Sequence, residues 1–167
     1  MTLPIRSRDF FRALAALGAA ALLSACATAP TPKPVVATIA AQAELSTLSR
    51  LIESAGLAAT LDAAPAVTIF APSDAAFAAV PKAQLDKLAA DKAELARVLG
   101  FHVVPGASVA AADVKPGNVK TQIGANLPLS KAGDIVTVDE AMVIRADVRA
   151  TNGVVHVVDR VLMPPKR

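Results

Sequence analysis

The segment TIFAPSDAAFAAVP, Thr68–Pro81, contains a change from one type of secondary structure to another. It begins inside AVTIF (Ala66–Phe70), whose β-branched and aromatic residues suit a strand. An apolar helical pattern follows. Pro72 fixes its own φ angle, and Ser73 or Asp74 can accept hydrogen bonds from the free backbone amides at the start of a helix. The segment therefore predicts a strand-to-helix corner.

Ser73 and Asp74 also have the residue types of a nucleophile and its acid. A hydrolase site needs a histidine within reach of the serine, and its usual sequence trace is a sharp GxSxG turn. The sequence contains no such pattern. Helix capping is the preferred interpretation, so we predict no catalytic residue and expect no enzyme.

Residues 1–25 have the organisation of an export signal. Three arginines precede an apolar run from Ala13 to Leu23, which is shorter than the roughly 20 residues that a membrane-spanning helix needs. The sequence RSRDFFR resembles a twin-arginine signal in which Ser7 replaces one arginine. Export as an unfolded chain is therefore preferred, and the twin-arginine route is the alternative.

The sequence LSAC places the only cysteine, Cys26, directly after the expected cleavage position. This arrangement resembles the bacterial lipobox, which implies a diacylglyceryl thioether on Cys26 and an acylated amine. Two acyl chains are enough for stable anchoring. The alternative is an ordinary cleavage site followed by a free cysteine. By resemblance to enteric lipoproteins, the absence of Asp after the cysteine, where Ala27 stands, favours sorting of the protein to the outer membrane.

The sequence predicts three parts: a lipoprotein signal peptide (1–25), a lipidated cysteine with a Pro-rich tether (26–35), and a globular domain (36–165). Prolines at 30, 32 and 34 favour an extended polyproline spacer. Removal of the signal takes away three arginines and one aspartate and leaves a net charge of +1. With scattered basic residues and no Tyr or Trp, we expect no nucleic-acid partner.

The domain divides into a helical first half and a second half rich in strands. A helix is predicted around Leu45–Ile52 with Gly56 as its stop, and one or two helices over 83–100 with Gly100 at the end. After Gly133, short apolar runs alternate with turn signals. Asn152 and Gly153 tolerate positive φ and predict a tight reversal between Val148 and Val154. This pattern indicates an α+β domain.

Three segments in register resemble a known family, the fasciclin (FAS1) domain. Thr68–Pro81 resembles its first signature, and NGVVHVVDRVLMPP (Asn152–Pro165) resembles its second. VLGFHVVPG (Val98–Gly106) resembles the segment that the family writes with Tyr-His, and Phe101 here replaces the tyrosine. The structural positions of the two signatures are Thr68, Phe70, Pro72, Ser73, Asp74, Phe77, Asn152, Gly153, His156 and Asp159.

The resemblance covers residues 36–165 and implies the α+β FAS1 fold, a wedge-shaped β-sandwich with helices packed on one side. It also implies a mostly non-catalytic domain of cell adhesion and matrix proteins, whose bacterial members are often secreted proteins or lipoproteins. By the same resemblance, Phe101 and His102 form the candidate binding surface.

His102 and His156 are the only histidines. A zinc site needs three or four ligands, so we predict no metal. We expect each histidine to be half-buried and bonded to the backbone or to a carboxylate, with Asp159 or Asp74 as candidates. Because histidine changes charge between pH 5 and 8, the stability of the domain is expected to depend on pH.

The sequence leads us to expect a non-catalytic, lipid-anchored binding module of the bacterial cell envelope, facing the periplasm or the outside. It would contact an envelope or matrix protein or a polysaccharide and use no cofactor, and weak self-association stays open. The alternative is a carrier of a small hydrophobic ligand or lipid in an apolar pocket beside Phe101 and His102, with few polar groups for specificity.

Overall fold

The computed structural model describes residues 33–165. The first half contains α1 (Val35–Ala40), η1 (Ala43–Leu45), α2 (Ser46–Ala55), α3 (Ala58–Ala63), β1 (Val67–Pro72), α4 (Asp74–Ala78), α5 (Lys82–Ala90) and α6 (Lys92–Phe101). The second half contains β2 (Val103–Pro105), η2 (Ala111–Asp113), β3 (Gly117–Lys120), β4 (Asn126–Ala132), β5 (Ile135–Val138), β6 (Ala141–Ala150) and β7 (Gly153–Val158). The predicted α+β class is confirmed.

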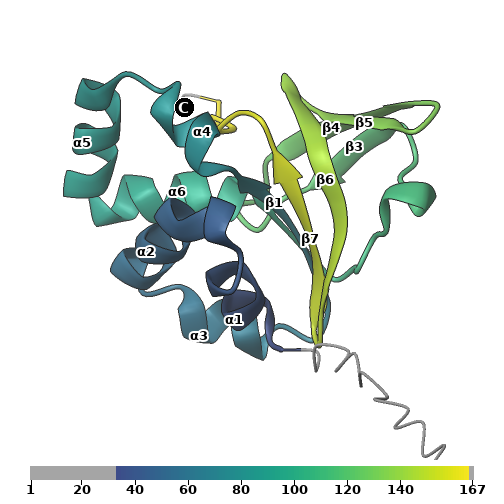
Figure 1. Cartoon of the computed structure of the whole chain (residues 1–167), viewed down its shortest axis with the longest axis horizontal. Coiled ribbons are helices and arrows are strands. Elements are labelled where there is room, and N and C mark those ends of the chain that lie inside the picture. The colour runs from purple at the N-terminus through teal and green to yellow at the C-terminus, as the bar shows by residue number, and fades with distance from the viewer. Residues whose placement is uncertain (1–32, 166–167) are drawn as a thin grey trace, which may run out of the picture. The chain divides into compact units, whose positions relative to one another are not determined.

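The strands form one seven-stranded sheet in the order β2-β1-β7-β6-β5-β4-β3. Only β1 and β7 pair in parallel; the other pairs are antiparallel. The helices lie along one side of this sheet, as predicted (Figure 1). The sheet nearly closes, because Gln122 N, after β3, donates to Val103 O in β2 at 2.8 Å.

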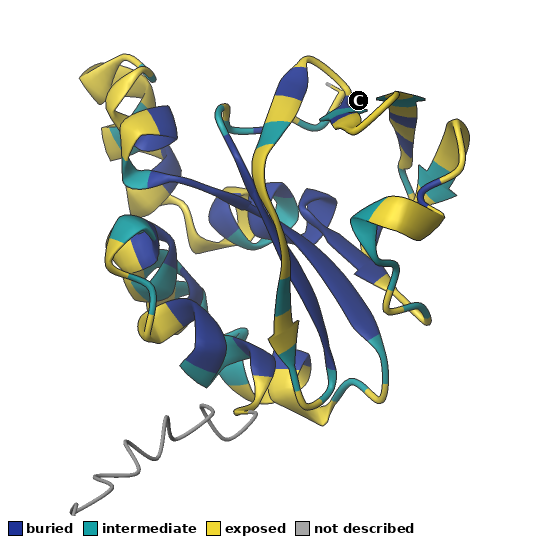
Figure 2. Cartoon of the chain, turned by 45° about the vertical axis from the view of Figure 1, so that its right-hand side comes forward, coloured by how far each residue is buried: buried dark blue, intermediate teal, exposed yellow. Residues whose placement is uncertain are grey.

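The sheet separates two hydrophobic cores. The first lies between the helices and one face of β1 and β7, with Ile69 and Val157 in it. The second lies inside the bent sheet, where Phe70 from β1 and Leu127 from β4 are buried together. All residues of β1 and β7 are therefore buried, whereas β6 is largely exposed (Figure 2).

Strand β6 belongs to both halves of the sheet. It pairs with β7 over Val143–Ala150 and with β5 through Ala141 and Met142. Two register shifts interrupt its pairing with β7, and Asp147, within the second shift, has a φ of 59°. Bulges of this kind bend a strand and increase its twist, which is how one sheet can enclose the second core.

Two of the predicted helix boundaries are confirmed and one is wrong. Gly56 ends α2 with a φ of 71°, and the pattern over 83–100 is two helices divided at Asp91. Gly100, in contrast, lies inside the last turn of α6. A Cβ at Gly100 would lie 2.8 Å from Ile123 Cγ2, so this glycine provides space for the β3–β4 turn.

The tight reversal at Asn152–Gly153 is confirmed, but its predicted reason is wrong. Ala150 pairs with Gly153 across the turn, and neither Asn152 nor Gly153 has a positive φ. A Cβ at Gly153 would overlap the carbonyl oxygen of Val67 in the neighbouring strand. The glycine is required because β1 and β7 approach closely at this point.

The side chain of Asn152 connects three separate segments. Its Oδ1 accepts from Val35 N at 2.9 Å, the first amide of α1. Its Nδ2 donates to Leu61 O at 2.8 Å and Ala64 O at 3.2 Å, and also lies 3.3 Å from Asp62 O. One amide therefore holds the start of α1 and the end of α3 against the β6–β7 turn.

The described chain begins beside the same turn. Thr151 N donates to Lys33 O at 2.9 Å, and Thr38 Oγ1 donates to the same oxygen at 3.0 Å. Val35 is fully buried, which corrects its assignment to the tether. In Figure 1 this end lies at the bottom and the C-terminal end at the top, near α4.

We predict that Asn152→Ala lowers the free energy of unfolding by about 2–4 kcal/mol, because it leaves buried backbone groups without partners. Chemical denaturation of both proteins measures the difference. Asn118→Ala, at an exposed position of β3, is the control and should cost about 0.5 kcal/mol or less. Equal losses in the two variants would contradict the role assigned to Asn152.

Candidate functional site

Ser73 is the N-cap of α4, as predicted. Its Oγ accepts from Ala76 N at 3.1 Å, and its own N donates to Val158 O at 3.1 Å. The side chain is almost fully buried, with the residue 5% exposed. Through these hydrogen bonds Ser73 joins the strand-to-helix corner to the end of β7. They do not indicate that Ser73 acts as a nucleophile.

Asp74 caps a different helix from the one that it begins. Its Oδ1 accepts from Thr47 N at 2.8 Å and its Oδ2 from Ser46 Oγ at 2.7 Å. The N-cap residue of α2, Leu45, makes no side-chain capping bond of its own. Asp74 therefore supplies the missing cap of α2 across the fold, which corrects the expectation that it caps the helix after Pro72.

The environment of Asp74 favours its charged form. Burial by itself would raise its pKa, but the hydrogen bonds from the backbone and side chains of Thr47 and Ser46 outweigh this effect and lower the pKa. A carboxylate near the first turn of a helix also interacts favourably with the helix dipole. The ionised carboxylate is thus the form that stabilises α2.

We predict that Asp74→Ala lowers the free energy of unfolding at pH 7 by about 1 kcal/mol, the usual cost of losing a helix cap. Because the pKa of Asp74 is lowered in the folded state, this difference should disappear in acid, once its carboxylate is protonated. Denaturation curves at several pH values measure it. Asp86→Ala, exposed on α5, should show no such loss.

His102 lies in the interior, where it holds the C-terminal segment. Its Nδ1 is 2.8 Å from Val98 O, and its Nε2 accepts from Leu162 N at 2.9 Å. A carbonyl can only accept and an amide can only donate, so His102 is neutral with its proton on Nδ1. Burial lowers its pKa to about 4, against the opposing effect of the bond to Val98.

Phe101 and His102 are each 2% exposed. This corrects the expectation that they form a binding surface. Phe101 belongs to the core inside the bent sheet, and both polar atoms of the His102 ring are occupied by backbone groups. The segment resembling the Tyr-His motif therefore joins α6 to β2 through the interior.

His156 has the opposite tautomer in the second core. Its Nε2 donates to Val109 O, an acceptor 2.8 Å away, and Asp147 N approaches its Nδ1 at 3.3 Å. Its ring stacks on Phe70, with centroids 5.6 Å apart. Burial lowers its pKa, while the carbonyl of Val109 and the charge of Asp147 oppose this effect.

Two details of the histidine predictions are wrong. Both rings are almost completely buried, whereas half-burial was expected. The carboxylates expected as partners are engaged elsewhere: Asp159 Oδ1 accepts from Met142 N at 2.7 Å, and Asp74 caps α2. The expected hydrogen bonding to the backbone is confirmed. The carboxylate whose charge acts on the pKa of His156 is that of Asp147, a residue that the sequence did not single out.

Thr68 holds the loop between β2 and β3. Its Oγ1 donates to Ala107 O at 2.8 Å and accepts from Val109 N at 3.0 Å. His156 binds the carbonyl of the same Val109. Thr68 and His156 thus fix the irregular segment around Val109, and both side chains have internal partners.

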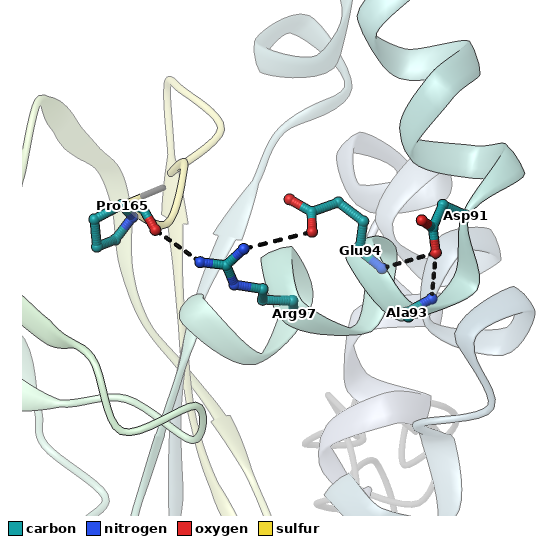
Figure 3. A network of polar contacts seen from close by, with 5 residues as sticks. All are labelled: Asp91, Ala93, Glu94, Arg97 and Pro165. Atoms are coloured by element: carbon teal, nitrogen blue, oxygen red, sulfur yellow. Dashed lines mark hydrogen bonds and ion pairs between the residues drawn. The ribbon is translucent and has the colours of Figure 1, made fainter. Parts of the chain in front are cut away.

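A hollow of about 530 Å³ lies beside Arg97, with Ile123, Gly124, Ala125 and Pro165 around it. Arg97 Nη2 donates to Pro165 O at 2.7 Å, and its Nη1 lies 3.6 Å from Glu94 Oε2 (Figure 3). Asp91 caps the same helix through Ala93 N and Glu94 N. Arg97 thus links Pro165, the last described residue, to α6. The sequence contained no signal that predicted this contact.

An apolar cavity does lie beside His102, between α2, α3 and α6, but its volume is only about 10 Å³. This is about the space of one water molecule, far below the 300–1,000 Å³ of typical ligand pockets. A cavity of this size does not provide the ligand space that a carrier would need beside His102.

Within residues 33–165, no three His, Cys, Asp or Glu side chains are grouped to hold a metal ion. None of the helices described there combines the length and hydrophobicity needed to cross a membrane. Cys26 and the signal peptide lie outside the described residues, so these findings do not bear on them.

The buried histidines predict an acid-sensitive fold. Because the folded-state pKa of His102 is about 4 and its ordinary value is 6.5, the unfolded chain binds more protons between these values. The free energy of unfolding should fall by about 3 kcal/mol as the pH is lowered from 6.5 to 4, at about 1.4 kcal/mol per tenfold change in proton affinity. His156 acts in the same direction.

Urea denaturation at pH 7, 6, 5 and 4 measures this loss. In His102→Gln, which removes the titrating ring, the protein should be less stable at pH 7 but lose less stability on acidification. A midpoint that stays flat from pH 7 to 4 in the unmodified protein would show that the histidines are not held neutral by the fold.

Comparison with known proteins identifies the family. Residues 43–164 match the family model described as the fasciclin domain. Protein sll1483 of Synechocystis sp. is 39% identical over 133 residues, covering 78% of this chain and 73% of that protein. Cell surface glycolipoprotein MPB83 of Mycobacterium bovis is 38% identical over 99 residues, covering 59% of this chain and 44% of that protein.

The fold is shared with a solved structure, a FAS1 domain pair from the insect cell adhesion molecule fasciclin I. The TM-score is 0.64 at 17% identity, and the match covers 79% of this chain and 51% of that chain. The chain thus spans about half of the domain pair.

The chain belongs to the fasciclin family, and the predicted FAS1 fold is confirmed. Domains of this family are adhesion-type modules and are generally non-catalytic.

Proposed function

We propose that this protein is a non-catalytic binding module, anchored through Cys26 in the bacterial cell envelope and contacting an envelope or matrix protein or a polysaccharide. The observation that carries the proposal is the combination of a fasciclin domain with LSAC at Leu23–Cys26. The similarity to the cell surface glycolipoprotein MPB83 of Mycobacterium bovis supports it.

The described structure is compatible with such a tether. The chain enters the domain at Lys33, beside the β6–β7 turn. Residues 26–32 separate Cys26 from that point and, at about 3.1 Å per residue in a polyproline conformation, reach roughly 20 Å. An anchor at Cys26 would place the β6–β7 turn toward the membrane and the C-terminal end away from it.

The arrangement of polar groups favours binding over catalysis. Ser73, His102 and His156 are the serine and the two histidines of the three motif segments, and all three are buried with backbone partners. A substrate could reach their polar atoms only if these bonds were broken. Contact with a partner therefore falls to the exposed faces of the strands and helices.

Cys26→Ser tests the anchor. We expect the unmodified protein in the membrane fraction and Cys26→Ser as a soluble or unprocessed chain, because serine cannot carry the thioether-linked diacylglycerol. Fractionation with mass spectrometry of the N-terminus measures both properties, and Thr31→Ser is the control. A processed, lipid-modified Cys26→Ser protein in the membrane would contradict the proposal.

The contact itself needs a separate test. The purified mature chain is expected to bind envelope proteins or polysaccharide immobilised from the same bacterium. If it bound neither, and a deletion strain showed normal surface attachment and envelope integrity, the binding role would be wrong even with a lipidated Cys26.

A further inference from the structure

The outer face of strands β4, β5 and β6 is apolar and exposed. Ile135 is 54% exposed, Ile144 51% and Met142 43%, and these are three of the four exposed large hydrophobic residues among the described ones. Single residues of this kind are common on protein surfaces, but a group on one sheet face is not. We call this surface the outer sheet face; its members are Pro128, Ser130, Ala132, Ile135, Thr137, Met142 and Ile144.

The pairing of the strands places these side chains together. Thr137 of β5 pairs with Met142 of β6. Ile135 lies two residues before Thr137 and Ile144 two residues after Met142, and because the strands are antiparallel both lie on the same side of this pair. On β4, Ser130 pairs with Thr137 and Ala132 with Ile135. Because side chains alternate along a strand, the residues between them point into the second core, as Val136, Val138 and Leu129 do.

No member of the outer sheet face is charged, although charged residues occur on the same strands. Lys131 lies on the opposite side of β4, where its Nζ donates to Ala112 O at 2.6 Å. Arg145, past the first register shift of β6, reaches Glu44 near the start of α2 at 2.8 Å. The fold therefore directs these charges away from Ile135, Met142 and Ile144.

We propose that the outer sheet face packs against the same face of a second copy of this chain. A two-fold contact brings an uncharged surface against itself, so no charge is buried without a partner. An antiparallel face can stack on another sheet at about 10 Å, which is how sandwich sheets pack. A partner with a basic or acidic surface would find no opposite charge on this face with which to form an ion pair.

The path of the chain outside the domain favours a second copy. Strand β6 ends at Ala150, next to Thr151, which binds Lys33 at the start of the described chain. Strand β6, which carries Met142 and Ile144, thus ends beside the start of the described chain. A two-fold axis parallel to β6 sets the faces of two copies against each other and leaves both tethers on the same side, toward one membrane.

This part of the inference rests on the proposed anchor, because attachment to one membrane raises the effective concentration of the copies. The contact between the faces does not depend on the anchor. The two proposals can therefore fail separately, and the experiments below keep them apart.

Thiol crosslinking in intact cells tests the contact. The full chain carrying Ile144→Cys is treated with a short bismaleimide, and Met163→Cys is the matched control, because Met163 is the fourth exposed large hydrophobic residue (38%) and lies outside the face. We expect a covalent dimer for Ile144→Cys and little for Met163→Cys. Equal yields, or no dimer with Ile144→Cys, would overturn the proposal.

Sedimentation of the soluble mature chain carrying Cys26→Ser removes the anchor from the test. We expect a concentration-dependent dimer whose Kd rises at least about tenfold in Ile144→Lys, since each copy then loses a buried isoleucine and gains a facing charge. Met163→Lys should leave the Kd unchanged. A monomer at millimolar concentration, or equal effects of the two variants, would contradict the face-to-face contact whatever the state of the anchor.

Discussion

The hydrogen bonds of the Asn152 side chain hold the rest of the structure in place. One amide binds the first N–H of α1 and the last carbonyls of α3 while its own backbone carbonyl accepts from Val67 N. Helices without caps of their own, a strand start and a hairpin turn are thereby joined at one point. The neighbouring Gly153 lets β1 and β7 approach closely there, so the central parallel pair and the helical layer are set together.

Buried polar side chains serve the irregular parts of the chain in the same way. Thr68 and His156 hold the loop before η2, and His102 holds the segment that follows β7. These segments cannot satisfy their backbone groups by regular pairing, and buried groups without partners are costly. Neutral imidazoles suit the task because each offers one donor and one acceptor. The signatures of the family thus describe how the fold is held together.

Because these polar side chains bind the backbone in the interior, the residues that contact a partner have to be sought on the surface. A single bent sheet has an inner face that is filled and an outer face that the helices cover only in part. Beyond the helical layer, β4, β5 and the first part of β6 remain open to solvent with apolar side chains. An adhesion-type module needs such a face more than it needs a pocket, because broad contact is made with exposed side chains.

Features that depend on a few neighbouring residues could be predicted from the amino-acid sequence alone. The strand-to-helix corner at Pro72 and Ser73 and the end of α2 at Gly56 could be predicted because capping and helix periodicity are local. The position of the hairpin at Asn152 was also predicted, although Gly153 is required there by the close approach of β1 and not by a positive φ. Which groups these residues contact depends on the folding of distant parts of the chain. Asp74 binds a helix 27 residues away, and Asn152 binds an amide 117 residues away. Likewise, the burial of Phe101 and His102 and the exposure of Ile135 and Ile144 follow from how one sheet bends, which no short pattern records.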